Sequence, residues 1–97
     1  MKSAPNTIDE LPVVCFSAID ARHTHTGNAT QIVSGAVQGA AAGLAICQDE
    51  HGNYYLFGCD ENWQTITDTW HQTLHDARSQ AEFEYAGVSE TWQEGPS

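Results

Sequence analysis

The sequence predicts an α+β fold, an antiparallel sheet of four or five strands with one C-terminal helix packed across it. Three observations lead to this prediction. Apolar, β-branched and aromatic residues concentrate in short runs at 13–19 and 54–59, as in strands. A five-residue link, 49–53, separates two apolar runs, and apolar residues after position 73 recur every three or four positions, as on a helix face. The 97 residues suit a single domain spanning 1–97.

The beginning of the chain is predicted to hold two strands after an irregular start. Residues 1–11 are expected to be a flexible lead-in. The run 13–19 forms the first strand, the polar connection 20–28 leads away from it, and 29–37 returns as a second strand. At the other end of the chain, residues 93–97 are expected to be a loose tail.

The middle of the chain is predicted to form a hairpin and one further strand. Residues 42–48 and 54–60 flank the link 49–53, in which a glycine can adopt a positive φ. Both alternating faces of 54–59 are apolar, which indicates a central strand covered on both sides. The helix would cover one face, and a second layer or a dimer partner the other. Threonine and tryptophan content favours another strand over 63–70.

The C-terminal helix has recognisable start and stop residues. Thr73 followed by Asp76 is typical of a helix N-cap, with Asp68 as an alternative start, and Gly87 supplies a stop. The stripe that would face the sheet comprises Leu74, Ala77, Ala81, Tyr85 and Val88.

The charge balance restricts the kinds of partner. Thirteen acidic residues against three basic ones give a formal net charge of -10. From residue 48 onward Arg78 is the only fixed positive charge. We therefore expect no direct binding of nucleic-acid phosphates. Two alternatives stay open, a solvated acidic surface or a surface that binds a basic protein partner.

Cysteine usage and hydropathy bear on the compartment. Cys15, Cys47 and Cys59 are an odd number without a CxxC pair, which argues against a disulfide framework or a zinc finger. We expect reduced, mostly buried thiols, no cofactor and a cytoplasmic location. Residues 1–12 lack the apolar run of a signal peptide, and the glycine-diluted segment 32–47 is too short to span a membrane.

Histidine pairs offer zinc binding as an alternative function. His23 and His25 would share one face of a strand, and His71 and His75 one face of a helix. If Thr73 is the N-cap, His71 lies before the helix and the two rings do not share a face. If Asp68 is the N-cap, both histidines are helical and the pair survives. Gln72 stands where the HExxH motif of zinc proteases needs a glutamate, so this motif is incomplete.

Catalysis is not expected, because no GxSxG, phosphate-binding loop or dinucleotide-binding glycine pattern occurs. We predict a protein that acts by contact with a basic protein partner, with self-association through the sheet as a further expectation. Phe83 would lie opposite the apolar stripe, either covered by the chain end that carries Trp92 or exposed as a contact. Large aromatic residues ringed by polar ones carry most contact energy. The predicted contact residues are Asp60, Glu61, Trp63, Trp70, Glu82, Phe83, Glu84 and Trp92.

Residues 54–92 contain a tyrosine-rich strand, the segment ITDTWH and the helix QAEFEY, in that order. This stretch resembles the C-terminal half of a family of small uncharacterised bacterial proteins in which the same three segments follow one another. The resemblance implies a bacterial origin and a compact α+β domain, and it assigns no ligand or catalytic residue. Immunity proteins, antitoxins and other small bacterial inhibitors supply the functional analogy.

Overall fold

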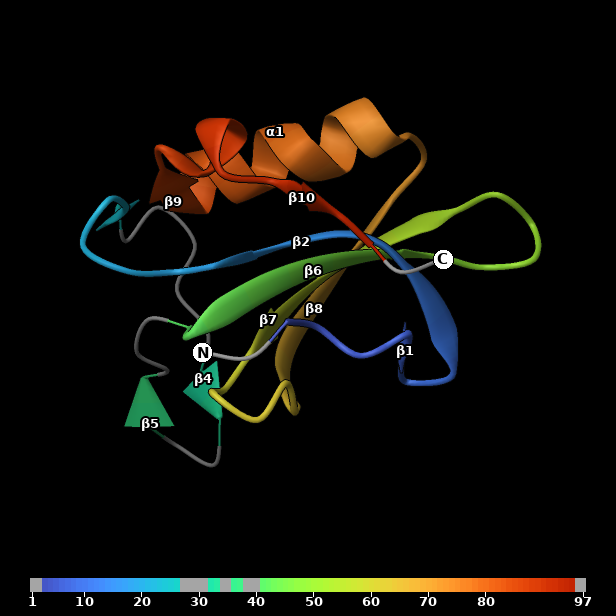
Figure 1. Ribbon diagram of the computed structural model, residues 1–97, viewed down its shortest axis with the longest axis horizontal. Helices are drawn as coiled ribbons and strands as arrows, with labels where there is room; N and C mark the ends of the chain where they lie inside the picture. Colours follow the sequence, from blue (N-terminus) through green and yellow to red (C-terminus); the bar gives the residue numbers. More distant parts are fainter. Residues whose placement is uncertain (1–2, 27–31, 34–35, 38–40, 96–97) are drawn as a thin grey trace.

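A curled antiparallel sheet carries a single helix, α1 (Leu74–Glu84), across one of its faces (Figure 1). The computed structural model describes residues 3–26, 32–33, 36–37 and 41–95. The strand order is β1 (Thr7–Ile8), β2 (Leu11–Ala18), β6 (Gly43–Gln48), β7 (Tyr54–Cys59) and β8 (Thr65–His71). The short elements are β3 (Thr24–His25), β4 (Ile32–Val33), β5 (Ala36–Val37), β9 (Tyr85–Ala86), the 3-10 turn η1 (Val88–Glu90) and β10 (Gln93–Glu94). The predicted α+β fold class is confirmed.

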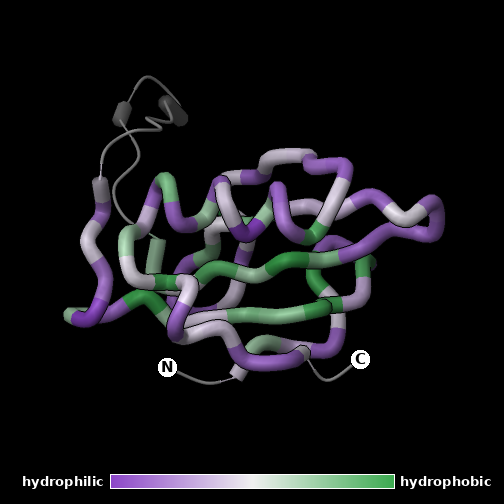
Figure 2. Tube along the Cα trace, turned by 90° about the horizontal axis from the view of Figure 1, so that it is seen from above, coloured by the Kyte–Doolittle hydropathy of each residue, from purple (hydrophilic) through white to green (hydrophobic). Residues whose placement is uncertain are grey.

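The helix packs on the sheet through the predicted apolar stripe. Ala77 and Ala81 are fully buried, and their small side chains let the helix axis lie close to the strands. They meet side chains such as Leu44 and Leu56 from β6 and β7. Tyr85 lies at the C-terminal end of the helix, and its hydroxyl accepts a hydrogen bond of 2.8 Å from the backbone N–H of Ala41. Figure 2 shows the hydrophobic stretches concentrated in the inner strands of the sheet.

The opposite face of the sheet is covered by the chain's own N-terminal segment. Ala4 and Ile8 are buried there together with Phe57 and Trp63. The predicted second layer is thus supplied by part of residues 1–11, the stretch expected to be a flexible lead-in. A few apolar side chains are enough to hold this polar segment on the sheet. Each of them buries its own apolar surface and also covers apolar surface of the strand beneath it.

A β-bulge in β2 allows this strand to contribute to both cores. Val13 pairs with Cys47 and Cys15 pairs with Ile46, so Val14 is an extra residue on this strand. Residues two apart normally share a face. Here Val13 joins the core beneath the N-terminal segment, whereas Cys15 joins the core beneath α1.

The turn between β6 and β7 has the predicted hairpin geometry. In the predicted hairpin turn, Asp49 accepts hydrogen bonds from the backbone N–H groups of His51 and Asn53, and Gly52 has φ 83°. The hairpin is confirmed.

The strand predicted for 63–70 is displaced, since β8 spans Thr65–His71. Trp63 has φ 62° and lies in a turn in which Asp60 Oδ1 accepts the backbone N–H groups of Asn62 and Gln64, at 2.8 and 2.9 Å. This carboxylate cap keeps Trp63 out of the strand and turns its ring into the core.

Residues 93–95, part of the stretch 93–97 expected to be a loose tail, join the sheet, and residues 96–97 lie outside the described part of the chain. Gln93 in β10 pairs with Phe16 in β2, and the backbone N–H of Gly95 donates to Val14 O at 2.8 Å. In Figure 1 the red C-terminal strand runs back over the blue N-terminal one. The order of these elements therefore brings both ends of the described chain onto β2.

Within the strand predicted for 29–37, β4 and β5 pair with each other as a separate ladder, and the other residues lie outside the described part of the chain. The apolar segment 32–47 contains β4, β5 and most of β6. Among the described residues, no helix is both long enough and apolar enough to cross a membrane.

Candidate functional site

Of the predicted aromatic anchors, one is buried, one is partly buried and two are exposed. Trp63 is 7% exposed and packs edge to face on Phe16, with ring centroids 5.8 Å apart. Trp92 packs against the core beneath α1. Trp70 is 55% exposed and Phe83 is 52% exposed. Phe83 is thus exposed and not covered, and its role as a contact residue stays a prediction. The exposed aromatic residues of the predicted set are Trp70 and Phe83.

The predicted acidic rim is also divided, because two of its carboxylates hold turns together. Asp60 caps the turn before β8. Glu82 accepts hydrogen bonds from the backbone N–H groups of Gly87 and Ser89, at 2.7 and 3.0 Å, and so fixes the end of α1. Glu61 is exposed on the turn before β8. Glu84 is partly buried and accepts a hydrogen bond from Gln80.

A groove of about 510 Å³ lies between the end of β8 and one flank of α1. We call it the β8–α1 groove. The helix contributes one stripe to it, with members spaced four and three residues apart, as residues on one helix flank are. The lining residues are Trp70, His71, Gln72, Asp76, Ser79, Gln80 and Phe83.

The two exposed aromatic residues flank β8 on opposite faces of the sheet. Trp70 pairs with Tyr55, whose ring stacks on Phe57 on the face away from the helix. Phe83 projects from α1, on the helix side. β8 is the last strand in the sheet order, and within the described part of the chain it pairs only with β7. The outer edge of β8 therefore runs between two large apolar side chains.

The electrostatic character of the groove is negative. Asp76 lines it, and Glu84 accepts a hydrogen bond of 2.8 Å from the lining residue Gln80. None of the lining residues is a lysine or an arginine. Burial lowers the pKa of His71 below its usual value of 6.5, against the opposing pull of Asp76 and Glu84. His71 is therefore uncharged at neutral pH and adds no positive charge.

The described arginines lie away from this groove. Arg78 lines a separate groove of about 390 Å³ on the other flank of α1, together with His75. Arg22 donates hydrogen bonds to both carboxylate oxygens of Asp20, and this contact holds the pKa of Asp20 at about 2. Neither arginine lines the β8–α1 groove.

The structure separates the histidine pairs proposed for zinc. Thr73 is the helix N-cap, with its Oγ1 accepting from the backbone N–H of Asp76 at 3.1 Å, so His71 ends β8 while His75 lies in α1. The two rings line different grooves. His25 stacks on Tyr85, with ring centroids 5.0 Å apart. Among the described residues, no group of three or more metal-binding side chains is placed to hold an ion.

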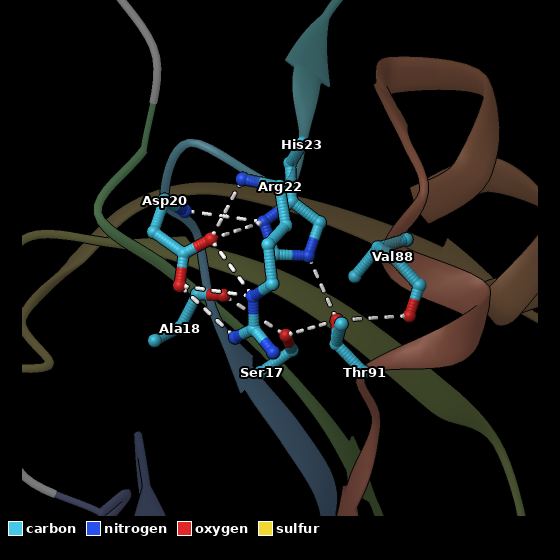
Figure 3. Close-up of polar contacts among 7 residues, drawn as sticks. All are labelled: Ser17, Ala18, Asp20, Arg22, His23, Val88 and Thr91. Atoms are coloured by element: carbon cyan, nitrogen blue, oxygen red, sulfur yellow. Dashed lines mark hydrogen bonds and ion pairs between the residues drawn. The ribbon is translucent and has the colours of Figure 1, made fainter.

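His23 belongs to a partly buried hydrogen-bond network between β2 and η1 (Figure 3). The backbone N–H of Asp20 donates to His23 Nδ1 at 3.1 Å, so the ring proton is on Nε2, which lies 2.8 Å from Thr91 Oγ1. Thr91 Oγ1 lies 2.7 Å from Ser17 Oγ. A histidine acting as a base would face the hydroxyl with its unprotonated nitrogen. The network links η1 to β2, and the arrangement of its donors suits a structural role.

The three thiols lie in the core of the fold. All three cysteines are free and buried, as the sequence predicts. Burial raises the pKa values of Cys47 and Cys59 to about 12, which keeps both protonated near neutral pH.

Comparison with protein-family models, curated proteins and solved structures gives no match for this chain. The resemblance of residues 54–92 to a bacterial family accordingly stays a prediction. Gln72, Ser79 and Gln80 line the groove but are not among the contact residues predicted from the sequence. The sequence predicts His71 only as a metal ligand and Asp76 only as part of the helix start. The available signal was the spacing of Asp76, Gln80 and Phe83, which places all three on one helix flank.

Proposed function

We propose that this protein is a small non-catalytic binding module that recognises a basic segment of a partner protein in the β8–α1 groove. The observation that carries the proposal is the pairing of two half-exposed aromatic residues, Trp70 and Phe83, around a groove that is lined by Asp76 and by no lysine or arginine. Aromatic anchors with a polar surround supply most of the energy of protein contacts.

The acidic composition supports the same proposal through association kinetics. A net charge of -10 attracts a basic protein at long range and repels nucleic acids. The analogy to bacterial inhibitors, immunity proteins and antitoxins gives the kind of role, which is to occupy a basic surface of another protein. Three free, buried thiols suit a reducing compartment such as the cytoplasm.

Variants that separate local contact from total charge test the proposal. The partner is captured from a bacterial lysate with the tagged chain, purified, and titrated against wild type, Trp70→Ala, Asp76→Asn and Glu61→Gln. Asp76→Asn and Glu61→Gln change the net charge equally, but only Asp76 lines the groove.

We expect Trp70→Ala to weaken binding by about 30-fold, as loss of a contact anchor does. Asp76→Asn should weaken it severalfold and reduce its salt dependence, and Glu61→Gln should leave the affinity unchanged. Equal effects of the two charge changes would show that the groove is not the contact surface, and an affinity indifferent to salt would contradict a basic partner.

A further inference from the structure

We infer that the segment bound in the β8–α1 groove is an extended basic strand that pairs with the outer edge of β8. This inference rests on the proposed function and specifies its binding mode. It makes the partner segment an additional strand of the sheet, so that backbone hydrogen bonds supply affinity and side chains supply selectivity.

The backbone of β8 supplies a regular edge. From Thr67 to His71 the strand pairs with Gly58 to Tyr54 without interruption. In an antiparallel strand, every second residue directs both its N–H and its C=O away from the paired neighbour. Along this stretch those groups point outward, toward the position a further strand would occupy. The register shift beyond Gly58 limits the regular edge to these residues.

Side chains on both faces of the sheet match such a strand. Asp68 pairs with Phe57, and Trp70 pairs with Tyr55, so Asp68 and Trp70 share the face away from the helix. On the helix face, Phe83 lies in the groove together with Asp76. An added strand projects alternate side chains to the two faces. Each face therefore offers one aromatic surface and one carboxylate, which fits a strand carrying both an apolar and a basic residue on each side.

Charge decides between a basic strand and a second copy of this chain. Exposed sheet edges are commonly protected from self-pairing by charged side chains, and Asp68 stands in the middle of this edge. Two copies that each carry a net charge of -10 repel one another, whereas a lysine-rich strand is attracted. The two modes respond to salt in opposite directions: screening weakens the heterologous contact and favours the self-contact.

The test uses the acetylated, amidated peptide KKVVKKVV, which presents lysine and valine on both faces of a strand. Amide hydrogen exchange and chemical shifts of the labelled protein are followed with this peptide. The acidic peptide EEVVEEVV serves as one control. The second control is KKVVKKVV methylated at two consecutive central amide nitrogens, which face opposite edges of a strand, so each edge loses a central donor and carries a methyl group in its place.

The expected result is slowed exchange at every second amide of residues 67–71 with KKVVKKVV, no binding of EEVVEEVV, and an affinity at least about tenfold lower for the methylated peptide. Shifts at Trp70 and Phe83 without slowed exchange, and equal binding of the methylated peptide, would overturn strand pairing and leave the proposed function standing. No shift in the groove would overturn both. Slowed exchange that appears without peptide and grows with salt would identify a second copy as the occupant and overturn the inference.

Discussion

Replacing Gly58 by alanine should destabilise the fold by pushing β7 and β8 apart. Gly58 pairs with Thr67, and a Cβ at position 58 would lie 2.5 Å from Thr67 Oγ1 and 3.5 Å from the Cβ of Ala41. Overpacking of this kind costs about 1–3 kcal/mol. The smaller backbone entropy of unfolded alanine returns about 0.4–1 kcal/mol. The net loss of unfolding free energy is therefore about 1–2 kcal/mol, which lowers Tm by roughly 4–16 °C for a chain of this size.

Thermal unfolding of Gly58→Ala, Thr67→Ala and the double variant, followed by circular dichroism, measures this effect. Thr67→Ala removes the Oγ1 that the new methyl group would meet, so the double variant should recover about 1 kcal/mol relative to the sum of the single changes. A neutral Gly58→Ala, or strictly additive changes, would refute the close β7–β8 contact that positions Trp70 and His71 in the groove.

Three further predictions concern the core, the helix cap and a titrating side chain. Trp63→Ala should cost about 3–5 kcal/mol in urea unfolding, whereas Trp70→Ala should change stability by less than about 0.5 kcal/mol, and equal costs would contradict the separation of buried from exposed tryptophans. Thr73→Ala should lower the free energy of unfolding by about 1 kcal/mol and Thr73→Ser by much less. Equal stability of both variants would contradict Thr73 as the N-cap. Because folding lowers the pKa of His71, the unfolded chain binds a proton at this side chain more readily than the folded one. The free energy of unfolding should therefore be unaffected by protonation of His71 above pH 6.5 and decline as the pH falls below that value. His71→Gln should reduce this pH dependence, and an unchanged profile would contradict its burial.

The helix and the hairpin are predictable from the sequence because their signals are local. The N-cap Thr73, the buried Ala77 and Ala81, and the positive φ of Gly52 each depend on residues within a few positions along the chain. The side chains at these positions specify the backbone almost without reference to the remaining fold. The structure therefore agrees with the sequence at each of them.

The ends of the chain were not predictable in the same way. β1 and β10 have two residues each, and both pair with β2, from opposite ends of the sequence. Such pairs have no periodic pattern of their own and gain their stability from the strand they join. Trp63 illustrates a related difficulty, since its burial follows from a turn with positive φ that strand-like composition conceals.

The candidate site was predictable only in its components. Trp70 and Phe83 are recognisable as large aromatic residues, but their shared groove depends on sheet order, on the register of β8 and on which flank of α1 faces that strand. Trp92 has the same residue type as Trp70, yet it packs against the core because β10 joins β2. Long-range pairing, which no local pattern encodes, decides which aromatic residue is exposed.

Mapping the contact surface of a basic peptide on the labelled protein tests the central claim most directly. In a titration with KKVVKKVV, the account predicts that the largest amide and indole shifts occur at Trp70, His71 and residues 76–83, and that Trp70→Ala removes them while Glu61→Gln does not. Shifts distributed over the exposed acidic residues, including Glu50 and Glu61 in the turns at either end of β7, would contradict a specific groove and leave only a solvated acidic surface.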